Sequence, residues 1–464
     1  MMVEEHSAGP TDSLINGTEP IINGTTTALP QPFGDAPPAE NGSTSTTAAP
    51  GLSADEIALY DRQIRLWGAE AQKRIRSANI LLISLRALGT EIAKNLTLAG
   101  INSLTIIDDE PVTEEDLGTQ YFVREEDVGR PRAEAAIPRI QELNPAVTVQ
   151  SGGPLAALLL HDQNFYHPYS CIIATDHDLL TLSHINTTAR FAARPFYAAA
   201  IHGFYGYIFA DLLTHTFVIE RAQSNLPTAL GPETPTRSIL SVTAKREPTT
   251  GKTTEIVQKQ ELYCPLILAN SSPLPASILT SRRKLKTVPA LIPCLRALWD
   301  FQRTYTHFPS PTSTADLATF TTLATAKARE LQLPLETLKS DFLRSFLQNI
   351  GAEILPTAAF VGGRLSEDVI NVLGKREQPI QNFAVFDGEG LEGRIYSLWS
   401  APPEVVGMAG GGGQDLSLRG SMAGGDGDGS GVLGSSNGLG AAGGVAVGAA
   451  GMASGVTSVP AERS

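Results

Sequence analysis

Runs of apolar residues alternate with amphipathic stretches along the middle of the chain. Residues 79–85 include four consecutive aliphatic side chains, which predicts a strand buried on both faces. Residues 90–99 place their apolar side chains on one helical face, and Gly100 follows them, as glycine often follows a helix. A second apolar run, 104–107, ends at Asp108. This order predicts a strand–helix–strand unit of the dinucleotide-binding type, with a carboxylate about 20 residues after the turn.

Further helices and strands are predicted on both sides of this unit. Ser53 and Glu56 form a capping-box pattern that predicts the first helix start. Apolar runs predict further strands, at residues 147–150, 169–174, 196–200 and 382–388. Amphipathic or apolar stretches predict helices between them, at residues 131–143, 184–193 and 354–373. We therefore expect an α/β fold with a Rossmann-like, mostly parallel sheet, and short alternating strands over 203–220 predict an antiparallel extension.

Composition divides the chain into five parts. Residues 1–52 are rich in Pro, Thr, Gly, Ser and Ala, and residues 403–464 are rich in Gly, so both are predicted to be disordered tails. Residues 53–224 and 351–402 are predicted to be the first and closing parts of one α/β domain. Residues 225–350 are predicted to be a variable, mainly helical insertion, in which 222–260 read as loop or loose strand.

The turn after the first strand lacks the glycines of a phosphate-binding loop. Such a loop needs glycines because its backbone N–H groups must approach the phosphate without a Cβ in the way. Here Ser84, Arg86 and Ala87 stand in the turn, and Gly89 is the only glycine left. We interpret these residues, with Asp108, as a degenerate nucleotide pocket. Asp108 is then either a ribose-binding carboxylate or, as we favour, a strand-end carboxylate whose ligand site has lapsed.

Two readings of Arg86 stay open at this stage. Its guanidinium is either a binding group for an anion or, as we favour, a surface charge or a plug for the empty pocket.

The charge and cysteine content exclude several classes of function. The formal net charge is −13, of which the two tails carry nine, and no basic stripe indicates nucleic-acid binding. Three widely spaced cysteines, Cys171, Cys264 and Cys294, offer neither a disulfide framework nor a zinc motif. No apolar stretch is long enough for a membrane span, and the N-terminus lacks a signal-peptide pattern. We expect the nucleus as the location, with the cytoplasm as an alternative.

A set of motifs resembles one enzyme family over most of the chain. The motifs are Tyr60-Asp-Arg-Gln-Ile-Arg-Leu-Trp-Gly68, Val128-Gly-Arg-Pro-Arg-Ala-Glu134, Leu143-Asn-Pro145, His202-Gly-Phe-Tyr-Gly-Tyr207, Phe360-Val-Gly-Gly363 and residues 382–388. Together with the strand–helix–strand unit, they resemble the adenylating enzymes that activate ubiquitin and ubiquitin-like proteins. Within that family the chain is most similar to the small, non-catalytic subunits of heterodimeric SUMO-activating enzymes.

The resemblance also shows which catalytic groups are replaced. Active members carry a G-x-G-G-x-G loop, of which Ser84, Arg86 and Ala87 replace three glycines. Thr119 stands where active members have an arginine, Arg132 where they have a lysine, and His177 follows Asp176 in place of asparagine. The zinc-binding cysteine pairs are missing, and neither Cys264 nor Cys294 has the Cys-Thr context of the acyl-accepting cysteine. The resemblance therefore implies a subunit that is not catalytic on its own.

Arg62 is the one residue for which the resemblance implies a direct role. In the family this arginine crosses the dimer interface and contacts ATP bound in the partner. The alternative is an ion pair with the neighbouring Asp61 or a plain surface charge.

The resemblance implies a heterodimer with a catalytic large subunit, which binds ATP and Mg²⁺ and contacts a SUMO-like modifier. We expect this chain itself to bind no cofactor, metal, nucleic acid or membrane. Three alternatives stay open: the corresponding subunit for the cullin-modifying ubiquitin-like protein, a homodimeric sulfur-carrier adenylating enzyme, and an NAD-dependent oxidoreductase. The altered loop disfavours the last two.

Overall fold

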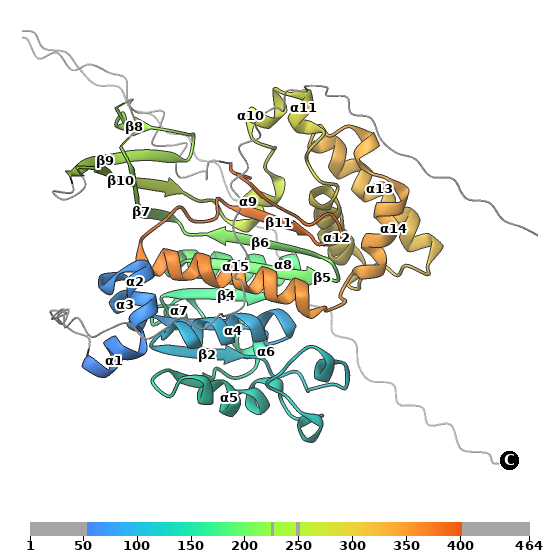
Figure 1. Ribbon diagram of the computed structural model, residues 1–464. Helices are drawn as coiled ribbons and strands as arrows, with labels where there is room; N and C mark the ends of the chain where they lie inside the picture. The colour runs from blue at the N-terminus through green and yellow to red at the C-terminus, as the bar shows by residue number, and fades with distance from the viewer. Residues whose placement is uncertain (1–52, 224–226, 247–250, 401–464) are drawn as a thin grey trace, which may run out of the picture. The chain divides into compact units, whose positions relative to one another are not determined.

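The structure is a computed structural model, and it describes residues 53–223, 227–246 and 251–400 (Figure 1). The predicted tails, 1–52 and 403–464, lie outside the described residues.

An eight-stranded sheet forms the centre of the domain, in the order β12-β11-β6-β5-β4-β1-β2-β3. Its strands are β1 (Asn79–Ile83), β2 (Ser103–Ile107), β3 (Thr148–Ser151), β4 (Cys171–Thr175), β5 (Phe196–His202), β6 (Tyr205–Asp211), β11 (Phe383–Asp387) and β12 (Glu392–Tyr396). The five strands from β5 to β3 are parallel, and β6, β11 and β12 add antiparallel pairs. In β1, Leu82 lies opposite Ile106 of β2 and Ile173 of β4. The predicted α/β fold with a largely parallel sheet is confirmed.

Helices cover both faces of this sheet, because β1, β2 and β4 are apolar on both sides. One face packs against α3 (Ala69–Arg76), α4 (Ala87–Ala99), α5 (Arg132–Leu143) and α15 (Leu355–Gly374). The other packs against α6 (Leu155–Leu158), α7 (Gln163–Tyr166), α8 (Leu179–Phe191), α9 (Leu266–Ser271), α12 (Leu291–Tyr305), α13 (Thr314–Glu330) and α14 (Ser340–Asn349). Figure 1 shows α15 lying beside α4 along the sheet. The remaining short helices are α1 (Ala54–Leu59), α2 (Asp61–Trp67), α10 (Ala276–Leu279), α11 (Arg282–Leu285) and the 3₁₀ turns 115–118, 125–127 and 335–337.

The block 225–350 differs from its predicted, mainly helical character. Its first part belongs to a second sheet, in the order β7-β10-β9-β8, formed by β7 (Thr214–Ala222), β8 (Gly231–Pro232), β9 (Arg237–Arg246) and β10 (Thr253–Leu262). Helices begin only at Leu266, and α9 and α12–α14 pack into the main core. The sequence predicts only loop or loose strand over 222–260, because neither long strand has an apolar alternation. β9 has no buried residue, and the buried positions of β10 include the charged residues Glu255, Lys259 and Glu261.

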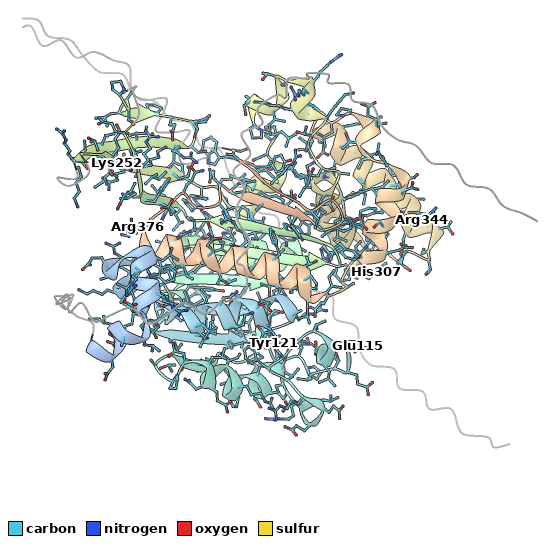
Figure 2. All side chains as sticks on the ribbon, viewed as in Figure 1. Glu115, Tyr121, Lys252, His307, Arg344 and Arg376 are labelled. Atoms are coloured by element: carbon cyan, nitrogen blue, oxygen red, sulfur yellow. The ribbon has the colours of Figure 1, made fainter. Side chains whose placement is uncertain are left out.

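The N-terminal helices are attached to this core by specific contacts. Ser53 and Glu56 form the predicted capping box at the start of α1. The phenol of Tyr60 lies against Gly100, where a Cβ would come within 2.5 Å of the ring. Past the end of α15, Arg376 (labelled in Figure 2) donates a hydrogen bond to the Trp67 carbonyl of α2, at 3.1 Å. These contacts hold α2 beside α4 and α15.

Candidate functional site

A cavity of about 730 Å³ opens at the carboxyl ends of β1, β2 and β4. The chain runs from β1 to β2 on one side and from β4 to β5 on the other, so the cavity lies at the point where the strand order reverses. Open α/β sheets bind their ligands at such a point. Ser84, Arg86 and Asp108 line the cavity, so the structure brings these sequence-predicted residues together.

The turn between β1 and α4 is held in one conformation by close backbone contacts. Ser84 has a left-handed backbone, with φ at 73°. A Cβ on Gly89 would lie 2.3 Å from the Ser84 carbonyl oxygen, so only glycine fits at position 89. Gly89 therefore serves the packing of the helix against the strand, while Arg86 and Ala87 stand at the helix start.

The N-terminus of α4 faces a carboxylate from a distant part of the chain. Glu353 Oε2 accepts hydrogen bonds from the Ala87 N–H at 3.4 Å and from the Thr119 hydroxyl at 3.3 Å. Glu353 Oε1 lies 2.8 Å from Arg86 Nε, as an ion pair whose geometry is not that of an aligned hydrogen bond. Helix N-termini bind anions because their N–H groups are unpaired and the helix dipole is positive there. Here a side chain of the protein occupies that position.

Asp108 is engaged by the protein and is not a free ribose ligand. One oxygen accepts the Leu85 N–H at 2.6 Å, and both oxygens accept from Arg132 Nη1, at 2.7 and 2.8 Å. Arg132 also donates to Asp116 at 3.3 Å. All three charged side chains are buried. Asp108 thus joins the start of the turn to α5, which is a structural role for a strand-end carboxylate.

Asp176 is a carboxylate of the cavity whose hydrogen bonding is incomplete. It follows β4 with φ at 58°, and its Oδ1 accepts the Ile201 N–H at 3.3 Å while its Oδ2 has no partner. Burial, and then the charge of Glu353, raise the pKa of Asp176 to about 7. Burial lowers the pKa of the adjacent His177. No group of three or more His, Cys, Asp or Glu within the described residues is arranged to hold a metal ion.

The three cysteines have no nucleophilic character. All are buried, and burial raises the pKa of Cys264 to about 11. Burial also raises the pKa of Cys171 and of Cys294 well above the ordinary range of thiols. Because the thiolate is the reactive form, none of the three is suited to accept an acyl group.

Arg62 lies outside the cavity, on the exposed side of α2. Asp61, its alternative partner from the sequence, pairs instead with Arg65 at 3.0 Å. Across residues 53–223, 227–246 and 251–400, no acidic side chain forms an ion pair with Arg62. The guanidinium is therefore available to a group outside this chain.

Sequence reasoning missed Glu353, which is the central residue of the site. It lies between α14 and α15, far from the turn in sequence, and nothing in residues 350–354 resembles a ligand-binding motif. The sequence shows Arg86 in place of a loop glycine and Thr119 in place of an arginine, but only the structure shows that both contact Glu353.

Comparison with known proteins gives consistent matches. Residues 60–403 match the ThiF family. The chain is 38% identical over 348 residues to the DNA damage tolerance protein RHC31 of Saccharomyces cerevisiae, covering 75% of this chain and 98% of that protein. It is 33% identical over 355 residues to SUMO-activating enzyme subunit 1 of Homo sapiens, covering 76% and 97%. The DNA damage tolerance protein rad31 of Schizosaccharomyces pombe is 33% identical, with 75% and 98% covered.

Among the helices that the structure describes, none has the length and apolar character required to cross a bilayer.

Proposed function

Because the chain belongs to the ThiF family, we propose that it is the small, non-catalytic subunit of a SUMO-activating enzyme. Its relatives over three quarters of its length include proteins named SUMO-activating enzyme subunit 1. In this role it pairs with a larger catalytic subunit, which adenylates the C-terminus of a SUMO-like modifier and then carries it as a thioester.

The observation that carries the proposal is the carboxylate at the start of α4. Where a nucleotide-binding member of such a fold would place a phosphate, this chain has Glu353 bonded to Ala87 and paired with Arg86. A phosphate there would meet a negative charge instead of free N–H groups. The chain therefore contributes its fold to the enzyme, and ATP and Mg²⁺ belong to the partner's site.

Arg62 gives the chain a direct part in that partner's chemistry. Its helix is fixed: Gln63 donates to the Leu98 carbonyl at 3.2 Å, and Trp67 donates to Gln72 at 2.7 Å. A guanidinium presented from a fixed helix can approach the triphosphate of ATP bound across an interface. Arginine suits this task, because it is permanently charged and offers a planar fork of donors.

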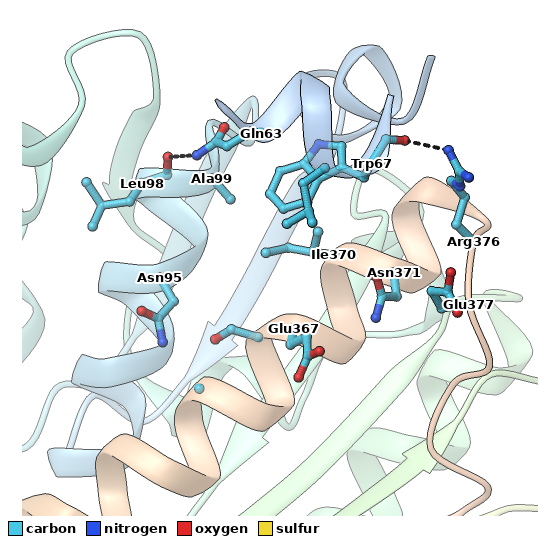
Figure 3. A pocket seen from close by; sticks show the side chains of 13 residues that line it. Gln63, Trp67, Asn95, Leu98, Ala99, Glu367, Ile370, Asn371, Arg376 and Glu377 are labelled. Carbon is cyan, nitrogen blue, oxygen red and sulfur yellow. Dashed lines mark hydrogen bonds between the residues drawn. The ribbon is translucent and has the colours of Figure 1, made fainter. Parts of the chain in front are cut away.

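A groove beside the helix that carries Arg62 has the features of an interface. A groove of about 610 Å³ runs between α2, α4 and α15 (Figure 3). Leu66 and Leu98 line it and are 77% and 45% exposed. Gly363 of α15 also lines it, and a Cβ there would meet no atom within 4 Å. A mid-helix glycine costs about 1 kcal/mol relative to alanine, and close approach of another chain is a reason to keep it.

The partner in this proposal is the catalytic large subunit, and the modifier contacts mainly that subunit. We propose the nucleus as the place of action, with the cytoplasm as an alternative.

Affinity purification of the full chain from its own cells tests the proposal. The expected product is a complex with one larger chain that carries a phosphate loop and a catalytic cysteine. This complex should exchange ATP with pyrophosphate in the presence of a SUMO-like modifier, and not with the cullin-modifying protein. A stable homodimer, exchange by the chain alone, or the opposite modifier preference would each contradict the proposal.

A further inference from the structure

The first N–H of α4 is bound by a carboxylate of this chain. The Ala87 N–H, the Thr119 hydroxyl and the Arg86 guanidinium converge on the single carboxylate of Glu353, at 3.4, 3.3 and 2.8 Å. The side chain of Glu353 is only 10% exposed. Arg86 and Ala87 replace glycines of the phosphate-binding loop, and Thr119 replaces an arginine of the active family members. Three of the departures therefore meet in one contact, centred on Glu353.

The backbone around Glu353 is anchored to the sheet. The Gly351 N–H donates to His202 Nδ1 at 3.3 Å, and the Gly203 N–H donates to the Ala352 carbonyl at 2.7 Å. Burial lowers the pKa of His202 to about 4, so the ring is neutral near pH 7 and Nδ1 can accept this bond. Glu353 thus approaches the helix from a segment fixed at the end of β5.

An anion is the ligand that the start of a helix favours, and an adjacent arginine adds to that preference. Glu353 supplies the anion from within the chain. We propose that Glu353 is an internal anion that occupies the phosphate position of the cavity and excludes phosphate-bearing ligands from it.

The surrounding charges strengthen the exclusion. Asp108, Asp109, Glu110, Glu115 and Asp116 also line the cavity, and Arg86 and Arg132 are the only Lys or Arg residues among the described residues that line it. Arg132 is already shared between Asp108 and Asp116. Arg86 is therefore the cation that an incoming phosphate could use, and Glu353 holds it.

Binding of inorganic tripolyphosphate and of ATP to the full chain tests the inference. Titration calorimetry on the wild type and on Glu353→Ala compares the site with and without its internal anion. We expect Glu353→Ala to bind tripolyphosphate at least about tenfold more tightly, because both the helix start and Arg86 become free. The double variant Glu353→Ala/Arg86→Ala should lose most of this gain.

Glu115→Ala is the matched control. Glu115 is an exposed carboxylate that lines the same cavity (labelled in Figure 2), and it forms no hydrogen bond or ion pair with Glu353, Arg86 or Thr119. Its removal changes the net charge equally without freeing the start of α4. Equal gains in Glu353→Ala and Glu115→Ala would reduce the effect to general electrostatics and overturn the inference, as would tight tripolyphosphate binding by the wild type.

Glu353→Gln keeps the shape of the side chain and removes its charge. If Glu353→Ala fails to fold, Glu353→Gln decides the matter by the same comparison, with a smaller expected gain. These titrations need neither partner nor modifier, so their outcome is separate from that of the exchange assay.

Discussion

The side-chain amide of Asn144 donates a hydrogen bond to the hydroxyl of Tyr60, at 2.9 Å. The same amide donates to the Thr97 carbonyl at 3.0 Å, and both residues are buried. The bond joins the motif that begins at Tyr60 to the Leu-Asn-Pro motif after α5, across 84 positions of the chain. Two patterns that are separate in sequence thus form one support, which fixes the start of the helix that carries Arg62.

Replacing Tyr60 by Phe should weaken this support without removing the ring. We expect the free energy of unfolding to fall by about 1 kcal/mol, because one buried hydrogen bond is lost while Asn144 keeps its bond to Thr97. Urea unfolding followed by circular dichroism measures the change. Tyr305→Phe is the control, since Tyr305 is 45% exposed and should give a change near zero. If Tyr60→Phe and Tyr305→Phe lower the free energy of unfolding equally, the hydrogen bond between Asn144 and Tyr60 does not stabilise the chain.

Substitution of Gly363 should affect the stability of the isolated chain and its binding to the large subunit in opposite directions. Gly363→Ala is expected to stabilise the isolated chain by up to about 1 kcal/mol, since the Cβ enters open space in a helix. The same methyl group should weaken binding of the large subunit, measured by sedimentation or calorimetry. Gly362→Ala is the matched control: its Cβ would lie 2.8 Å from Glu91 Cβ, so it should destabilise the chain itself. If the Gly363→Ala chain binds its partner as tightly as the wild type does, this groove is not part of the interface.

The buried carboxylate of Asp176 should make stability depend on pH. Its pKa is about 7 in the folded chain, against an ordinary 3.8, so the folded chain binds more protons between these values. The stability that this group contributes is present below about pH 3.8 and is lost as the pH rises through 7. Asp176→Asn removes this loss.

The stability of Asp176→Asn relative to wild type should therefore be greater at pH 8 than at pH 5. Chemical unfolding at the two pH values measures it. His202 titrates in both proteins, so its effect cancels in the comparison. Glu115→Gln serves as a control and should show the same stability difference from wild type at both pH values.

Arg62→Ala should leave folding and dimerisation intact while slowing formation of the modifier adenylate. In-trans arginines contribute roughly 10³–10⁵ in rate to phosphoryl transfer; since adenylyl transfer involves a different phosphate, we expect a slowing of at least about tenfold. Arg62→Lys should restore only part of the rate, because it lacks the planar fork. Single-turnover adenylate formation by the purified heterodimer, at saturating ATP and modifier, gives the rate, and ATP affinity is measured separately.

Arg65→Ala is the control within the same helix, because Arg65 is already paired with Asp61. If Arg62→Ala matches the wild type in both rate and ATP affinity, Arg62 is only a surface charge and the chain is only a scaffold.

Much of the fold could be predicted from local pattern. Four aliphatic residues in succession predict β1 because a strand buried on both faces needs them, and Gly100 ends α4 in a left-handed conformation. β9 could not be predicted in this way, since none of its residues is buried. The replaced turn residues Arg86 and Ala87 are visible in the sequence, but their common partner is not. Glu353 reaches α4 from 266 positions away, and such a contact leaves no periodicity to read.

The pairing of Arg86 with Glu353 bears on how the chain could ever regain nucleotide binding. Arg86→Gly as a first step would leave the largely buried carboxylate of Glu353 without its cation. Such a change destabilises proteins, because the remaining charge is no longer compensated. Mutating Glu353 first would free the start of α4 and Arg86 for an anion, but the Cβ atoms of Arg86 and Ala87 would still stand where a phosphate loop has bare backbone. The first of these changes is thus unfavourable, and the second restores anion binding without the backbone of a phosphate loop. The contact therefore couples two positions that lie far apart in the chain, and a phosphate loop at the start of α4 would require a change at both.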